Sequence, residues 1–153
     1  MYNDKLIETM KEKIMEAFAE LGFQLEQMGD FGYGFSYEGT NFIYLSNDDD
    51  DFLNISVPGI YDLEDGPPST FIELMNKINS TLKYIKAYDL EQSIWLFYER
   101  ELLGDEDLPK VISRMILHLE VGLMFSRKTI AEIKSNADDK SQDNDNVESD
   151  DKE

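Results

Sequence analysis

The chain of 153 residues has no cysteine, which excludes disulfide bonds and thiolate chemistry. It has one histidine, His118, so acid–base or metal chemistry based on imidazole would depend on this residue alone. No apolar run approaches the ~20 residues that a membrane-spanning helix needs. The first residues, Met1 to Lys5, lack the apolar core of a signal peptide. We therefore expect a cytoplasmic protein without a membrane span.

Positive charge is scarce as well. The chain has 14 basic and 33 acidic side chains, which gives a net charge of -19. Such a charge repels phosphate backbones and anionic membrane surfaces. We therefore expect no nucleic-acid partner and no membrane partner, whereas a polypeptide with basic segments is electrostatically favoured.

The charge divides the chain into two parts. Ser135 to Glu153 contain eight acidic residues, two basic residues and a single valine, which leaves -6 in this segment and -13 in the rest. A segment with so few apolar residues buries too little surface to offset its conformational entropy. The sequence therefore predicts a single domain over residues 1–134 and a disordered acidic tail over residues 135–153.

Within the domain, apolar residues at spacings of three and four predict three helices. They run from about Asn3 to Leu21, from near Ser69 to Leu82, and from about Asp105 to Ile133. Thr70 and Glu73 have the spacing of a capping box at the start of the second helix.

Alternating apolar residues predict the strands, and turn residues separate them. The expected strands are Phe23–Met28, a segment from Phe31 to Tyr37, Phe42–Leu45, Leu53–Val57, Lys83–Asp89 and Ser93–Arg100. Glu38 to Asn41 form either a hairpin turn or a bend with a bulge at Gly39. Pro58-Gly59 is expected to end the strand before it. If the two segments on either side of Gly39 are counted as one bent strand, the overall order is α-β-β-β-α-β-β-α, which indicates an α+β fold.

The strand Ser93–Arg100 is apolar on both faces, since Ile94, Leu96 and Tyr98 alternate with Trp95 and Phe97. One interpretation is a central strand covered by helices on both sides. The other is an aromatic sheet face that packs on another chain. The second interpretation assigns partner binding to Tyr33, Phe35, Tyr37, Trp95 and Phe97. The partner in that contact would most readily be a copy of the same chain in a two-fold homodimer.

We find no motif that predicts catalysis. His118 lies in the last helix beside Met115 and Leu119, and the helix supplies no partner for a general base or a metal ligand, so we interpret it as structural. Gly32-Tyr33-Gly34 lacks the third glycine of a nucleotide-binding loop and lies in a strand pattern. No catalytic residue, cofactor site or metal site is predicted.

The acidic loop Asn47 to Asp51 invites comparison with a calcium loop. A calcium loop of the EF-hand type needs a glycine at its sixth position and a glutamate at its twelfth. Counted from Asn47, these positions hold Phe52 and Pro58, so the match fails. A solvated loop with at most weak cation association is expected.

The second helix contains Leu74-Met75-Asn76-Lys77-Ile78-Asn79 and is followed by a strand pair through Trp95. With the element order, this resembles the type III secretion (Tir-type) chaperones and the bacterial sensory transduction regulators with a YbjN-like domain. The resemblance covers about Met1 to Ile133. It implies a twisted, mainly antiparallel sheet packed on helices, commonly dimeric, that binds another polypeptide without catalysis. Without it, Asn76 and Asn79 are ordinary polar residues of a helix surface.

The predicted function is a non-enzymatic protein-binding module, chaperone-like or regulatory. The alternative is a small enzyme or ligand-binding protein with a pocket between the sheet and the helices. A binding module should expose an apolar patch, whereas an enzyme should have a cleft with convergent polar groups.

Overall fold

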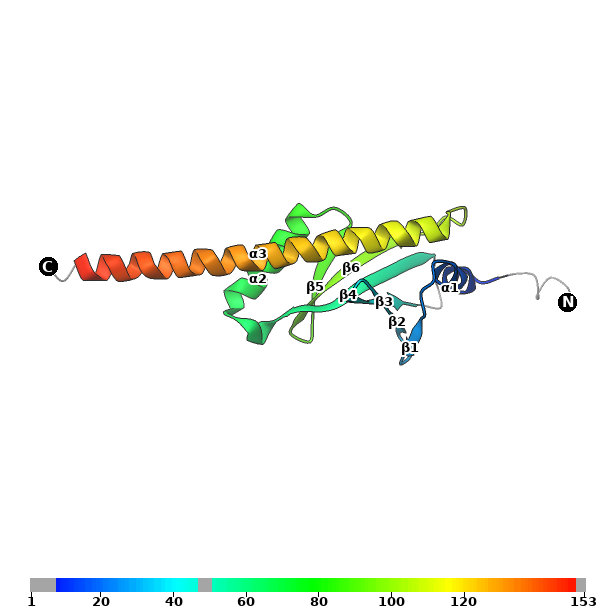
Figure 1. Cartoon of the computed structure of the whole chain (residues 1–153), viewed down its shortest axis with the longest axis horizontal. Helices are drawn as coiled ribbons and strands as arrows, with labels where there is room; N and C mark the ends of the chain where they lie inside the picture. Colours follow the sequence, from blue (N-terminus) through cyan, green and yellow to red (C-terminus); the bar gives the residue numbers. More distant parts are fainter. Residues whose placement is uncertain (1–7, 47–50, 151–153) are drawn as a thin grey trace, which may run out of the picture.

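The protein folds as one six-stranded antiparallel sheet with three helices (Figure 1). The computed structural model describes residues 8–46 and 51–150, with side chains as far as residue 139. The elements are α1 (Met10–Glu20), β1 (Glu26–Met28), β2 (Gly32–Tyr37), β3 (Thr40–Leu45), β4 (Phe52–Asp62), a 3-10 turn (Leu63–Asp65), α2 (Pro68–Thr81), β5 (Ile85–Leu90), β6 (Ser93–Glu101) and α3 (Leu108–Asp150). The predicted α+β fold with a mainly antiparallel sheet is confirmed. Four strands precede α2, whereas the predicted order has three there, because Glu38 and Gly39 divide the second segment into β2 and β3.

The strands lie in the order β1-β2-β3-β4-β6-β5, and each neighbouring pair is antiparallel. Residues opposite each other on neighbouring strands point to the same face of a sheet. One row of such residues is Tyr33, Tyr44, Ile55, Tyr98 and Ile85. The adjacent row, on the opposite face, is Glu26, Gly34, Ile43, Ser56, Phe97 and Lys86. These two rows define the two faces.

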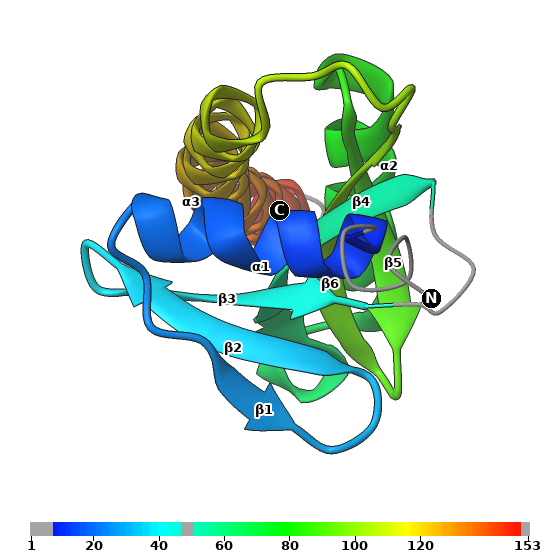
Figure 2. The same ribbon diagram turned by 90° about the vertical axis from the view of Figure 1, so that its right-hand side faces the viewer.

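The three helices pack on the face of the first row (Figure 2). The ring of Phe18 in α1 lies 5.0 Å from that of Phe35 and 5.4 Å from that of Tyr44. In α2, Phe71 contacts the ring of Tyr61 on β4, and α3 packs along β4 and β6. The main core therefore lies between the helices and this face, which we call the helix-covered face.

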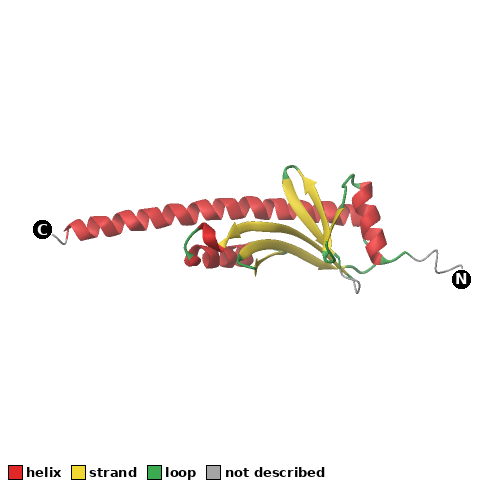
Figure 3. Cartoon of the chain, turned by 90° about the horizontal axis from the view of Figure 1, so that it is seen from below, coloured by secondary structure: helices red, strands yellow, loops and turns green. Residues whose placement is uncertain are grey.

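The β2–β3 connection is a two-residue hairpin turn, which decides between the two predicted alternatives. Glu38 and Gly39 both have positive φ, at 49° and 80°. Two consecutive positive φ values produce a turn whose twist matches the twist of the flanking strands. The hairpin β2–β3 stands out from the remaining strands, beside α3 (Figure 3).

The predicted start of the first helix is wrong, and so is the predicted capping box of the second, although α2 does begin next to Ser69. In α1 the side chain of Thr9 accepts a hydrogen bond from the Glu12 N–H at 3.1 Å, so the helix begins at Met10 and not near Asn3. In α2 the cap position is Pro67 and no side chain caps the helix. Thr70 is buried inside the helix instead of forming the predicted capping box. Pro68 can occupy the first turn because its missing N–H needs no partner there.

The strand β4 passes through Pro58 and Gly59, where the sequence predicts its end. Its register with β6 shifts between Val57 and Tyr61. Proline has no N–H to donate to a ladder, and a bulge is one of the few positions where a sheet tolerates it. Gly59 supplies a φ of 55° at this point. The strand then continues to Asp62.

The last helix is longer than predicted. α3 does not end near Ile133 but continues to Asp150, so the backbone of Ser135 to Asp150 is helical and not irregular. No glycine or proline follows Gly122, so no residue type interrupts the helix. This end of α3 projects beyond the sheet and α2 (Figure 1). Its contribution to stability remains a prediction.

Asn79 of α2 connects this helix to the edge strand β5. Its Nδ2 donates to the Ala87 carbonyl at 3.1 Å, and its Oδ1 accepts from the Ala87 N–H at 2.7 Å. An edge strand otherwise presents unpaired backbone groups that can pair with another chain. Asn79 therefore satisfies backbone groups at the sheet edge, whereas Asn76 is an exposed residue of the helix surface.

Candidate functional site on the helix-free face

The opposite face of the sheet is covered by no helix of residues 8–46 and 51–150, and we call it the helix-free face. The prediction of helices on both sides of β6 is therefore wrong. The helix-free face nevertheless contains buried apolar residues: Ile43 and Phe97 are only 3% and 6% exposed. Phe97 is shielded by the rings of Tyr88 and Trp95, with centroids 5.2 Å and 6.1 Å away. Strand neighbours on this face thus shelter part of it from water.

A hollow of about 530 Å³ lies on this face. It is lined by Phe31, Leu45, Leu90, Glu91, Ser93, Trp95 and Phe97. Phe31 and Leu90 at its border are 50% and 42% exposed. These residues come from β3, β5, β6 and the turn before β2, so the hollow spans β4. The lining is mostly apolar, which is typical of a binding surface.

Small residues create a second hollow of about 610 Å³ next to β1, β2 and β3. Gly34 and Ser36 of β2 line it, together with Met28 of β1 and Ile43 of β3. A Cβ atom on Gly34 would lie 2.7 Å from the Met28 Sδ, so a side chain there would have to displace Met28. The helix-free face is therefore hollowed over both halves of the sheet.

Several polar side chains also lie on this face. Ser56 is fully buried, and its Oγ donates to the Ile43 carbonyl at 3.5 Å. The Oδ1 of Asn54 is buried and accepts no hydrogen bond from the part of the chain that the structure describes. Glu91 and Ser93 are the polar residues that line the hollow of β3, β5 and β6.

The structure does not bring the five predicted partner-binding rings onto one surface. Trp95 and Phe97 lie on the helix-free face. Tyr33 stands opposite Tyr44, in the row of the helix-covered face that continues to Tyr98. Phe35 and Tyr37 follow Tyr33 at a spacing of two, so they lie on the same helix-covered face.

These three tyrosine and phenylalanine residues also differ in exposure. Phe35 is buried between Phe18 and Phe23, with ring centroids 5.0 Å away on each side. Tyr33 stacks on Tyr44. Tyr37 is 38% exposed and contacts the ring of Phe23 at 5.8 Å. Of the three, only Tyr37 is exposed enough to meet a partner without a rearrangement.

His118 lies half-buried on the helix-covered face. Its ring is 5.3 Å from that of Tyr84 and 5.9 Å from that of Tyr98, and these two tyrosines stack on each other at 5.5 Å. Burial, followed by the neighbouring Tyr84, raises the pKa of Tyr98 above its ordinary value. Among the described residues, the ring contacts of His118 are with these two tyrosines, and no carboxylate or serine is hydrogen-bonded to it. Ser93 lies on the other side of the sheet, so the chain's one histidine cannot act as its base.

The predicted cation loop falls largely outside the described residues, since positions 47–50 belong to the part that is not described. Within residues 8–46 and 51–139, no three histidine or acidic side chains are grouped closely enough to hold a metal ion. No helix in the described part of the chain carries an apolar stretch long enough to cross a bilayer.

Comparison with known proteins gives a likeness of fold. No protein-family model and no curated protein matches the chain. A similar solved structure is the crystal structure of an uncharacterized protein from Methanothermobacter thermautotrophicus. The similarity covers 80% of this chain and 96% of that chain, with a TM-score of 0.55 and 16% sequence identity. At this identity the likeness concerns the fold alone.

Phe31, Leu45 and Leu90 line the hollow but are missed by sequence reasoning. Phe31 and Leu90 stand next to turns, where an apolar residue breaks the polar pattern. An apolar residue beside a polar turn is therefore visible in the sequence as a candidate surface residue. This pattern could not show that Phe31 and Leu45 line one hollow with Trp95, because β3 and β6 are distant in the sequence.

Proposed function

We propose that this protein is a non-enzymatic protein-binding module that holds an extended apolar stretch of another polypeptide on the helix-free face. The apolar hollow bordered by Phe31, Leu90 and Trp95 supports this proposal most directly. Exposed apolar surface of this kind is usually an interaction site. The resemblance to type III secretion chaperones and YbjN-like regulators, by analogy, favours a chaperone-like or regulatory role in the cytoplasm.

The chemistry of the hollow favours a polypeptide over a reacting substrate. Its two polar lining residues, Glu91 and Ser93, have no histidine on their side of the sheet. General acid–base catalysis needs a second group within hydrogen-bond reach of the reacting proton. An open apolar surface instead suits the side chains of an extended chain.

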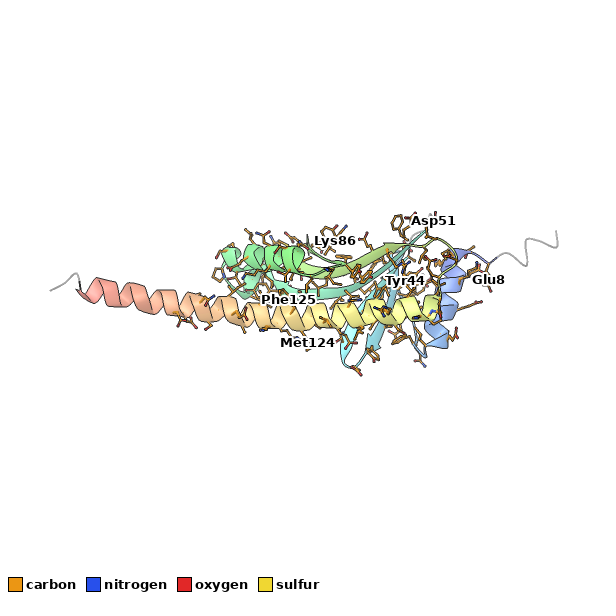
Figure 4. The ribbon with its side chains drawn as sticks, turned by 90° about the horizontal axis from the view of Figure 1, so that it is seen from above. Glu8, Tyr44, Asp51, Lys86, Met124 and Phe125 are labelled. Carbon is orange, nitrogen blue, oxygen red and sulfur yellow. The ribbon has the colours of Figure 1, made fainter. Side chains whose placement is uncertain are left out.

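The charge of the helix-free face indicates which kind of partner segment it would bind. The protein carries a net charge of -19. Acidic residues lie on the helix-free face, where Glu91 lines the hollow and Glu99 stands opposite Asn54 of β4. Lys86 is the basic residue of the row that contains Phe97, at the β5 edge (Figure 4). A partner segment with apolar side chains flanked by basic residues therefore complements this face.

The test is selection from a displayed random peptide library against the intact protein. Leu90→Lys places a charge at the border of the hollow and should abolish binding of the selected peptides. Ile72→Lys, at a similarly exposed apolar residue of α2, is the matched control and should bind like the wild type. Equal binding by both variants would contradict the proposal.

A homodimer through the aromatic residues of the helix-free face is a second proposal. The exposed rings of Phe31 and Tyr88 on this face support it. The high net charge opposes self-association, so added salt should tighten such a dimer. Sedimentation at micromolar concentration, at low and at high salt, tests it. A strict monomer at both salt concentrations would contradict it.

A further inference from the structure

The helix α3 has two apolar faces, and only one of them is covered. Ile112, Met115 and Leu119 are buried against the sheet side. Leu117, Val121 and Met124 follow at spacings of four and three on the opposite side and are 60%, 52% and 67% exposed. Figure 4 shows Met124 on the side of α3 that faces away from the sheet. A surface helix normally presents polar residues on the side away from the core, so an exposed apolar stripe on that side indicates a contact with a partner.

A small hollow adjoins the exposed stripe of Leu117, Val121 and Met124. It has a volume of about 350 Å³ and is lined by Leu21, Phe23, Tyr37, Ser113, Ile116, Leu117 and Glu120. Tyr37 thus extends the stripe from α3 onto the β2–β3 hairpin. An apolar side chain of a partner could enter this hollow and anchor the contact.

Basic residues bracket the stripe although the chain as a whole is acidic. Lys110 and Arg114 precede it, and Arg127 and Lys128 follow it, and all four are exposed. The hairpin side is acidic, where Glu120 is half-buried and both burial and the charge of Glu38 raise its pKa. The positive charge therefore lies at the two ends of the stripe and not along its side.

We propose that this outer stripe of α3 is a second docking surface, and that its occupant is an amphipathic helix with acidic residues at both ends of an apolar stripe. Fourteen positions separate Arg114 and Lys128, or about 21 Å along a helix that rises ~1.5 Å per residue. The carboxylates of the partner helix must therefore lie about four turns apart, with apolar residues between them.

The same charges disfavour a second copy at this surface. Arg114 and Lys128 each lie seven positions from Val121. In an antiparallel pair centred on Val121, Arg114 of one copy would face Lys128 of the other. A parallel pair would place each basic residue opposite its own copy. Both arrangements bring like charges together, and two chains of -19 also repel each other.

The probe for the test is a designed amphipathic peptide of about 18 residues, long enough to span both basic ends. One version has leucines at spacings of three and four with glutamates at both ends. Its matched version has lysines in place of the glutamates. We expect the acidic peptide to bind the full chain at least about tenfold more tightly than the basic one. Val121→Ser and Met124→Ser should abolish this binding, while Ile72→Ser should leave it unchanged.

A charge exchange keeps the test decisive if a serine variant is poorly folded. Exchange of all four basic residues, Lys110, Arg114, Arg127 and Lys128, for glutamate should reverse the preference, so that the basic peptide binds more tightly. Absence of binding, or equal binding of both peptides, overturns the proposal. So does a wild-type dimer that Val121→Ser dissociates, which would assign the stripe to a second copy. Binding to phosphatidylglycerol vesicles that Val121→Ser abolishes would assign it to a membrane and overturn it too.

Discussion

Trp95 and Leu96 are neighbours on β6, yet they face opposite sides of one sheet and have opposite surroundings. Leu96 is fully buried beneath the helices. Trp95 lies half-buried on the helix-free face, beside an open hollow. Two apolar faces of one sheet can therefore serve different purposes: one buries a core that stabilises the fold, and the other remains available to a partner.

The largest effect should come from truncating a residue of the helix-covered face. Leu96→Ala removes a fully buried side chain between sheet and helices, and should lower the free energy of unfolding by about 3 kcal/mol. Urea unfolding measures this loss. Trp95→Ala, its neighbour on the other face, should cost clearly less, because water already reaches part of the ring. Equal losses would show that the two faces do not differ in this way.

A smaller effect is expected at Asn79, which ties α2 to the edge of the sheet. Asn79→Ala removes both hydrogen bonds to Ala87 and should cost about 1–2 kcal/mol. Asn76→Ala, on the exposed surface of the same helix, is the control and should be nearly neutral. A neutral Asn79→Ala variant would contradict this role, because water would then replace both hydrogen bonds without loss of stability. Amide hydrogen exchange at Ala87 gives an independent measure, since it should accelerate in the variant.

The loop that leads from β6 to α3 should make stability depend on acid pH. The Leu103 N–H holds the pKa of Glu106 below its ordinary value, and the Gly104 N–H and Arg100 contribute to the same direction. The unfolded chain then binds the proton more readily, so this contribution is present near neutral pH and is lost as the pH falls below about 4.3. Glu106→Gln should show a flatter decline of the thermal midpoint in that range. An unchanged decline would contradict this role.

Removing the acidic end of α3 should have the smallest effect. The side chains of residues 134–139 are exposed, so truncation after Lys134 removes little packing. The thermal midpoint should change by less than the few degrees that ~1 kcal/mol produces in a domain of this size. Calorimetry of the truncated and full chains measures the difference. A larger drop would show that this end of the helix packs on the body of the protein.

Periodicity in the sequence predicts most of the fold, because apolar spacing directly reflects which side of an element is buried. The three helices and the strands around Phe35, Ile55 and Trp95 are present where the spacing indicates them. Boundaries are less predictable, since they depend on local competitors. Thr9 caps α1 late, and a bulge carries β4 past Pro58.

The candidate site is less accessible to sequence reasoning than the fold. Alternation shows that Trp95 and Phe97 share one face, and that Tyr33 and Phe35 share one face. It cannot show whether these are the same face, because that depends on the register between distant strands. The pairing of Ile55 with Tyr98 sets this relation, and no local pattern contains it.

The central claim is that the helix-free face binds a polypeptide, and Trp95 offers the most direct measurement because it is the chain's one tryptophan. Its indole N–H gives one resonance in an ¹H–¹⁵N spectrum, which can be followed while a library-selected peptide is added. We predict that this resonance shifts together with the amides of Leu45 and Leu90, while those of His118 and Met124 stay in place. An unmoved Trp95 resonance, with shifts confined to the helix-covered face or to α3, would contradict the claim.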